Sequence, residues 1–180
     1  VLFGGQEGCK IEAGQQVTSD EIDVDKLSAK AAAAKVNAQT GNTGVTATAK
    51  TEALVKVSDV ASGGAFTVKL NSNDGLEVNI SFTVNAGGSA ATSDDYAAAI
   101  NAFNAASSKT GVSAEWDENN KGIKLVNSAG ENINLKKISG GDEMKLSTYQ
   151  YGQTADAGGN DWNPEIGLAT AGIAVDDTGA

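Results

Sequence analysis

The longest regular pattern of apolar and polar positions covers residues 92–135. Tyr96, Ile100 and Phe103 recur at helical spacing, so they predict an amphipathic helix with one apolar stripe. Thr92 or Ser93 is suited to cap its start, and acidic residues follow in the first turn. Alternating apolar residues then predict three strands joined by turns, at 112–116, 123–125 and 133–135.

Part of this pattern occurs a second time, 67 residues upstream. Val36–Ala47 reads VNAQTGNTGVTA and Phe103–Ala114 reads FNAASSKTGVSA, with six identical positions of twelve. The same offset aligns Ala29, Ala33 and Val36 with the apolar stripe of the later helix. Such an internal repeat indicates that one helix–strand unit is used twice.

A β-hairpin is predicted between the two copies. Apolar residues alternate on both sides of Asn73-Asp74-Gly75, a turn sequence that supplies positive φ at little steric cost. We expect all of these apolar residues to share one face and to pack against both helices as the core of the protein. They are Phe66, Val68, Leu70, Leu76, Val78, Ile80, Phe82 and Val84.

The remaining elements complete a single domain of residues 1–180. A helix is predicted at about 25–38, strands at 45–49 and 53–57, and a late strand around Met144, Leu146 and Thr148. The predicted fold class is α+β: an antiparallel, β-rich domain with two short helices in a repeated helix–strand–hairpin arrangement. The repeated units span approximately 20–58 and 86–136, around a hairpin at 65–84.

Composition argues against several classes of function. The 180 residues carry a net charge of −10, so nucleic acid and anionic membrane are poor partners. All thirteen basic residues are lysine, which cannot form the bidentate contacts that arginine makes to phosphates and bases. Histidine, the commonest general base and metal ligand, is absent.

No catalytic, cofactor-binding or metal-binding residue is predicted, and we expect no cofactor. Asp20, Glu21, Asp23 and Asp25 are closely spaced, but they lack the spacing and central glycine of a calcium loop. Cys9 is the only cysteine, so it is either a small inert residue or a free thiol. Asn79-Ile80-Ser81 matches a glycosylation acceptor, but its position within a predicted strand favours an ordinary sheet residue.

The repeated motif resembles one found in a known family. A helix that ends in Val36-Asn37-Ala38, followed by Thr43-Gly44-Val45-Thr46-Ala47, is similar to the "IN" motif of bacterial flagellins and flagellar hook proteins. The later copy repeats it, with Ile100-Asn101-Ala102 or Phe103-Asn104-Ala105 before Thr110-Gly111-Val112-Ser113-Ala114. The likeness extends loosely over residues 15–135.

The resemblance implies a non-enzymatic, surface-exposed outer (variable) domain of a flagellin, extracellular in the bacterial flagellar filament and contributing to motility. Its partners would be other flagellin subunits, bound through polymerising end segments that we expect outside these residues, with both termini of the domain at one end. Contacts with host or other surfaces are possible. An outer domain of a hook or hook-associated protein is the nearest alternative.

Two alternatives belong to other classes. Trp116, Tyr149, Tyr151 and Trp162 would provide the stacking platform of a carbohydrate- or surface-binding adhesin module. Against this, Trp116 continues a strand pattern that favours burial. Paired carboxylates would suit a glycosidase, but chance pairs are inevitable in so acidic a chain.

Overall fold

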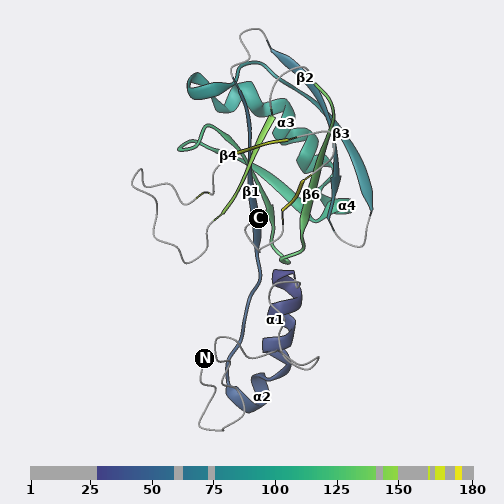
Figure 1. Cartoon of the computed structure of the whole chain (residues 1–180), viewed down its shortest axis with the longest axis vertical. Helices are drawn as coiled ribbons and strands as arrows, with labels where there is room; N and C mark the ends of the chain where they lie inside the picture. The colour runs from purple at the N-terminus through teal and green to yellow at the C-terminus, as the bar shows by residue number, and fades with distance from the viewer. Residues whose placement is uncertain are drawn as a thin grey trace.

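The two sheets of the protein are antiparallel throughout, and short helices accompany them (Figure 1). The computed structural model describes residues 28–58, 63–72, 76–140, 144–149, 162, 165–168 and 173–175. In this part of the chain the first sheet has five strands and the second has four. The predicted class, an antiparallel, β-rich α+β fold, is confirmed.

The five-stranded sheet has the order β4-β5-β1-β7-β8. Val55 of the central strand β1 lies opposite Ile123 of β5 on one side and Leu146 of β7 on the other. The strand predicted around Met144 is therefore confirmed. The strands are β1 (Thr51–Val57), β4 (Val112–Asp117), β5 (Gly122–Asn127), β7 (Met144–Thr148) and β8 (Ile166–Gly167).

The four-stranded sheet has the order β3-β2-β6-β9 and contains the predicted hairpin. Phe66 lies opposite Phe82 in it, and all of its predicted inward residues except Leu76 and Val78 are buried. The expectation that Leu76 is buried is wrong, because it precedes the first residue of β3 and remains 55% exposed. The strands are β2 (Gly64–Asn71), β3 (Glu77–Val84), β6 (Ile133–Ser139) and β9 (Ile173–Val175).

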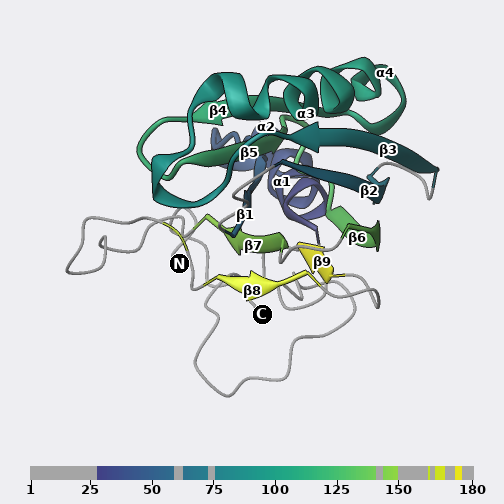
Figure 2. The same ribbon diagram turned by 90° about the horizontal axis from the view of Figure 1, so that it is seen from above.

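Helix α3 (Ser93–Ala105) bridges the two sheets, and Thr92 is its N-cap, as predicted. It lies against β3, an edge of the four-stranded sheet, and β4, an edge of the five-stranded sheet. It follows a short 3₁₀ turn at Gly88–Ala90 and leads into the single-turn helix α4 (Ser107–Thr110). Figure 2 shows α3 and α4 on the side of the molecule opposite β7 and β8.

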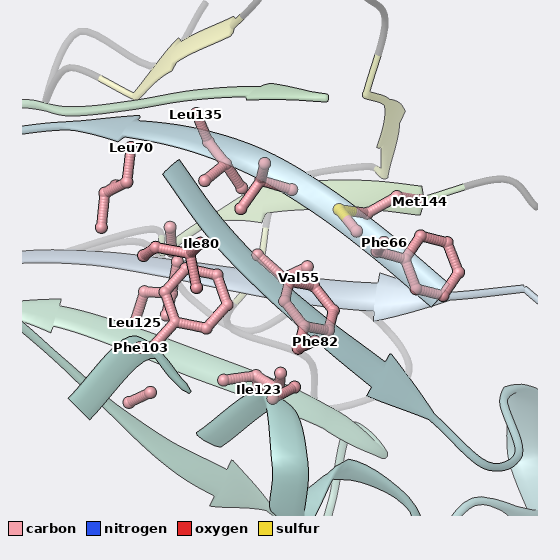
Figure 3. Packing of buried hydrophobic residues seen from close by; sticks show 14 of the residues in the cluster. Val55, Phe66, Leu70, Ile80, Phe82, Phe103, Ile123, Leu125, Leu135 and Met144 are labelled. Atoms are coloured by element: carbon pink, nitrogen blue, oxygen red, sulfur yellow. The ribbon is translucent and has the colours of Figure 1, made fainter. Parts of the chain in front are cut away.

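The core forms where the two sheets meet α3. The ring centroids of Phe66 and Phe82 lie 5.7 Å apart, and those of Phe82 and Phe103 lie 5.5 Å apart (Figure 3). Val55 and Leu125 of the five-stranded sheet belong to the same buried cluster. Aliphatic side chains make up most of this cluster, as the low aromatic content suggests.

The first repeated unit lies outside that core. Helix α1 (Ala29–Ala38) and the single-turn helix α2 (Thr40–Thr43) have no buried residues, and Figure 1 shows them apart from the sheets, at the other end of a long connection. The expectation that the hairpin packs against both helices is therefore wrong: it packs against α3 alone. Residues 45–50 connect this unit to β1 without joining a sheet, and they leave α1 away from the hairpin.

Two element boundaries of the first unit also differ from the prediction. Ser28 caps α1 by accepting a hydrogen bond from the backbone N–H of Ala31 (3.3 Å), so the helix begins at Ala29 instead of residue 25. Residues 45–50 follow α2 without joining either sheet, and β1 begins only at Thr51. In the described residues, no helix is long and apolar enough to cross a membrane.

Candidate functional site: the repeated helix–strand junction

In the second unit, one side-chain amide joins the helix to the strand that follows it. Asn104, at the end of α3, accepts a hydrogen bond at Oδ1 from the backbone N–H of Ala114 (2.8 Å). Its Nδ2 donates to the carbonyl of the same residue (2.9 Å). Because both bonds reach one residue of β4, they fix the position of that strand beside the helix.

The linker within this junction is held by the threonine and glycine of the motif. The hydroxyl of Thr110 donates to the carbonyl of Ala106 (3.1 Å) and accepts from the N–H of Val112 (3.3 Å). Gly111 has a φ of 68°, and its N–H donates to the carbonyl of Ser107 (2.7 Å). A left-handed residue at this position ends the helical turn, and glycine adopts that conformation without a steric penalty.

The first unit has the same junction. Asn37 accepts from the N–H of Ala47 (2.7 Å) and donates to its carbonyl (2.9 Å). Thr43 donates to the carbonyl of Gln39 (3.0 Å) and accepts from the N–H of Val45 (3.2 Å). Gly44 again ends the turn, with a φ of 69°. The sequence repeat is thus a structural repeat.

The two junctions differ in burial. Val112 and Thr110 of the second unit are completely buried, whereas Val45 of the first unit is 42% exposed and Thr43 is half-buried. The hydrogen bonds of the motif therefore form without a surrounding core. They define a local module that the chain uses once inside its core and once outside it.

A cleft of about 490 Å³ lies beside β1 and the β4–β5 turn, and charged residues line it. Lys56 donates to Glu165 (2.8 Å), and Lys145 lies 3.3 Å from the same carboxylate. The hydrogen bond from Lys56 is the main reason that the pKa of Glu165 is lowered. Lys121, also in the lining, pairs with Glu118. These ion pairs hold the residue that precedes β8 against β1 and β7, and they offset part of the positive charge of the cleft.

The proposed aromatic platform is divided between two ring pairs. Trp116 packs on Tyr96, with centroids 5.3 Å apart, and its indole N–H donates to Glu118 (2.7 Å). Trp162 meets Tyr149 edge-on at 5.2 Å and is only 7% exposed. A buried indole face is not available to stack on a sugar. Tyr151 lies outside the described residues.

The other candidate residues give little support for a metal site. In the part of the chain that the structure describes, no three His, Cys, Asp or Glu residues cluster closely enough to hold a metal ion. Asn79 is an exposed residue of β3. Residues 20–25, with the acidic group considered for calcium, lie outside the described residues, as does Cys9.

Comparisons with known proteins assign no family. Neither the family models nor the curated proteins contain a match to this chain. The junction geometry and the sequence motif are therefore the observations on which a function must be argued.

Sequence reasoning recognised the motif but not the role of its asparagines. The sequence did contain a signal for this role. Asn37 and Asn104 align at the repeat offset, and each precedes the alanine that it binds by ten residues. The pairing of Glu165 with Lys56 and Lys145 had no sequence signal. Lys56 and Glu165 are 109 positions apart, and Glu165 lies outside both repeated units.

Proposed function

We propose that this chain is a non-enzymatic structural domain from the outer, variable region of a flagellin-like filament protein. The observation that carries the proposal is the repeated junction, in which Asn37 and Asn104 make the same pair of bonds to Ala47 and Ala114. The residues that make these bonds include those on which the resemblance to flagellar proteins rests. Motif residues whose side chains bind only backbone groups of the same chain are typical of a structural domain.

The surface chemistry is consistent with this role. A net charge of −10 keeps copies that are packed densely side by side from adhering to one another non-specifically. The domain would project from the filament and present this polar surface to the medium, while the end segments of the full protein polymerise. Its location would accordingly be extracellular, in the flagellum.

The alternatives differ in how well the described residues support them. A hook or hook-associated protein shares the motif and remains the nearest rival. An adhesin module is less well supported, because the burial of Trp162 removes one face of the proposed platform. The cleft beside Lys56 holds ion pairs and no arrangement of a nucleophile with a general base among its described lining residues.

Immunogold labelling of source cells would test the proposal. Antibodies raised against the folded 180-residue chain should label the shaft of the flagellar filament along its length. Labelling confined to the hook or to the hook–filament junction would select the rival. Labelling of the cell surface, with none on flagella, would refute the flagellar assignment altogether.

A glycan-binding assay addresses the remaining alternative. The wild-type chain should show no saturable binding on a glycan array, and Trp162→Ala should change nothing there. Saturable binding that is abolished by this substitution would overturn the structural interpretation in favour of an adhesin.

A further inference from the structure

The cleft beside β1 and the β4–β5 turn carries a local excess of positive charge in an acidic protein. Its described lining residues include Lys56, Lys121 and Lys145, and Glu165 is the one acidic residue among them. Lys56 and Lys145 share that carboxylate, at 2.8 Å and 3.3 Å from its two oxygens. Lys121 pairs with Glu118, which is 70% exposed, so that this pair contributes little. Two of the three positive charges in the lining are thus left without a buried counterion.

Two of these lysines lie directly opposite each other in the sheet. Lys56 of β1 is the register partner of Lys145 of β7. Like charges at opposite positions of neighbouring strands destabilise a sheet. The two side chains are only 26% and 33% exposed, so water and salt screen their repulsion incompletely. Glu165 compensates one charge of the pair, and a further anion between these lysines would be stabilised.

A close backbone approach brings the third lysine to the same place. A Cβ added at Gly122 would lie 2.8 Å from the carbonyl oxygen of Val55 and 2.9 Å from Cγ of Lys56. The turn that precedes Gly122 is therefore pressed against the stem of Lys56. In that turn Lys121 has a φ of 52°, the only positive φ outside glycine in the described part of the chain. This conformation is unfavourable for lysine, and such outliers cluster at sites that bind ligands.

The size and the neutral groups of the cleft indicate a small, polar occupant. Its volume of about 490 Å³ is within the range of small-molecule sites. Ser89, Asn119 and Asn120 add hydroxyl and amide groups to the lining. A polyanion would be repelled by the net charge of −10, whereas a small anion is governed by the charges next to it.

We infer that this cleft binds a small dianion, either a dicarboxylate or a phosphate. Its two negative charges match the excess of the lining, and the three lysines hold it as point charges. The serine and asparagine side chains donate hydrogen bonds to its remaining oxygens. The inference does not depend on the flagellar proposal, because no described lining residue belongs to either repeated junction.

A nuclear magnetic resonance titration of the full 180-residue chain tests this inference. Inorganic phosphate and succinate are the probes, each added at neutral pH and at an ionic strength held constant with sodium chloride. Amide signals of Lys56, Lys121 and Lys145 should shift saturably with at least one probe, and the probe that binds more tightly identifies the anionic group. A titration without saturable shifts for either probe would overturn the inference.

Three substitutions separate specific binding from a general effect of charge. Lys145→Gln should weaken binding roughly tenfold or more. Lys69→Gln is its matched control, because Lys69 is 32% exposed and pairs with Glu77 at 2.8 Å in the other sheet. It removes the same charge and should leave the affinity within about twofold of the wild type. Equal losses in the two lysine variants would assign the binding to overall charge and refute the cleft.

Glu165→Gln gives a result that a folding defect does not reproduce. It removes the carboxylate that competes with the ligand for Lys56 and Lys145, so binding should become tighter than in the wild type. Unchanged or weaker binding in Glu165→Gln would contradict the inference, since the anion would then not contact the two lysines that Glu165 bridges.

Discussion

The backbone N–H of Val57 donates a hydrogen bond to the hydroxyl oxygen of Tyr96 over 3.0 Å, and both residues are buried. Val57 ends the central strand of the five-stranded sheet, and Tyr96 lies in the first turn of α3. The ring of Tyr96 also packs on Trp116 at the edge of that sheet. One side chain thus fixes the helix against two strands, with its single polar atom satisfied inside an apolar core.

Tyr96→Phe should destabilise the protein although it preserves the ring. It leaves the N–H of Val57 buried without this acceptor, at a cost of about 1–3 kcal/mol in the free energy of unfolding. Urea denaturation followed by circular dichroism measures the difference. An unchanged midpoint would mean that water reaches this N–H group in the variant.

The same residue makes stability depend on alkaline pH. Burial is the main cause that raises the pKa of Tyr96 above its ordinary value of 10.0. The neutral phenol is therefore favoured in the folded state, and its contribution is fully present below pH 10 and is lost as the pH rises through the folded-state pKa. Unfolding midpoints measured between pH 8 and 12 should fall less steeply in Tyr96→Phe than in the wild type. Parallel curves would assign the alkaline loss to other groups.

The two asparagines of the repeat provide a comparison of one interaction in two environments. Asn104→Ala removes two hydrogen bonds at a partly buried junction that belongs to the core, and it should cost about 1–3 kcal/mol in global stability. Asn37→Ala removes the equivalent bonds at an exposed junction, and it should change global stability by less than about 0.5 kcal/mol. Equal losses in thermal unfolding would show that the first unit unfolds together with the sheets.

The pattern of apolar positions predicted most of the second unit, because burial and sequence agree there. Alternation in residues 112–135 and at the hairpin reflects side chains that do lie in the core. The first unit has the same local pattern, but its exposure depends on what covers it, which no local pattern encodes. The alanines of α1 are compatible with a buried helix and with an exposed one. For the same reason Leu76, a regular member of its alternation, was predicted as buried and is exposed at the strand end.

Gly130→Ala should disturb the contact of the first unit with the turn between β5 and β6. Gly130 has a φ of 73°, and an added Cβ would lie 2.3 Å from the Cβ of Ala49 and 3.0 Å from the backbone nitrogen of Lys30. The left-handed backbone alone costs a non-glycine residue about 1–2 kcal/mol, and the hydrogen bond from the Lys30 N–H to the Gly130 carbonyl (3.0 Å) would be displaced. Denaturation should show this loss, and limited proteolysis should cleave residues 28–50 faster.

Gly41→Ala is the control for that prediction. Gly41 lies in α2, and an added Cβ meets nothing within 4 Å. Replacing a glycine at such a compatible position is neutral or stabilises by about 0.4–1 kcal/mol, since it restricts the unfolded chain. If both alanine variants were cleaved at the same rate, the contact between Gly130 and the first unit would not hold that unit in place.

Acid should weaken the start of α3 through one carboxylate. Asp95 accepts hydrogen bonds from the backbone N–H (2.9 Å) and the hydroxyl (2.7 Å) of Thr92, and the hydroxyl bond is the main cause that lowers its pKa. A lowered folded-state pKa means that the contribution is present above the ordinary value of about 3.9 and is lost as the pH falls through the folded-state value. Asp95→Asn should therefore be less stable than the wild type at pH 7, and the difference should shrink toward pH 2. Asp94→Asn removes the same charge from the same turn without touching the contact with Thr92, and it is the matched control. If the two variants followed the same curve, the effect would belong to the helix dipole and not to the contact with Thr92.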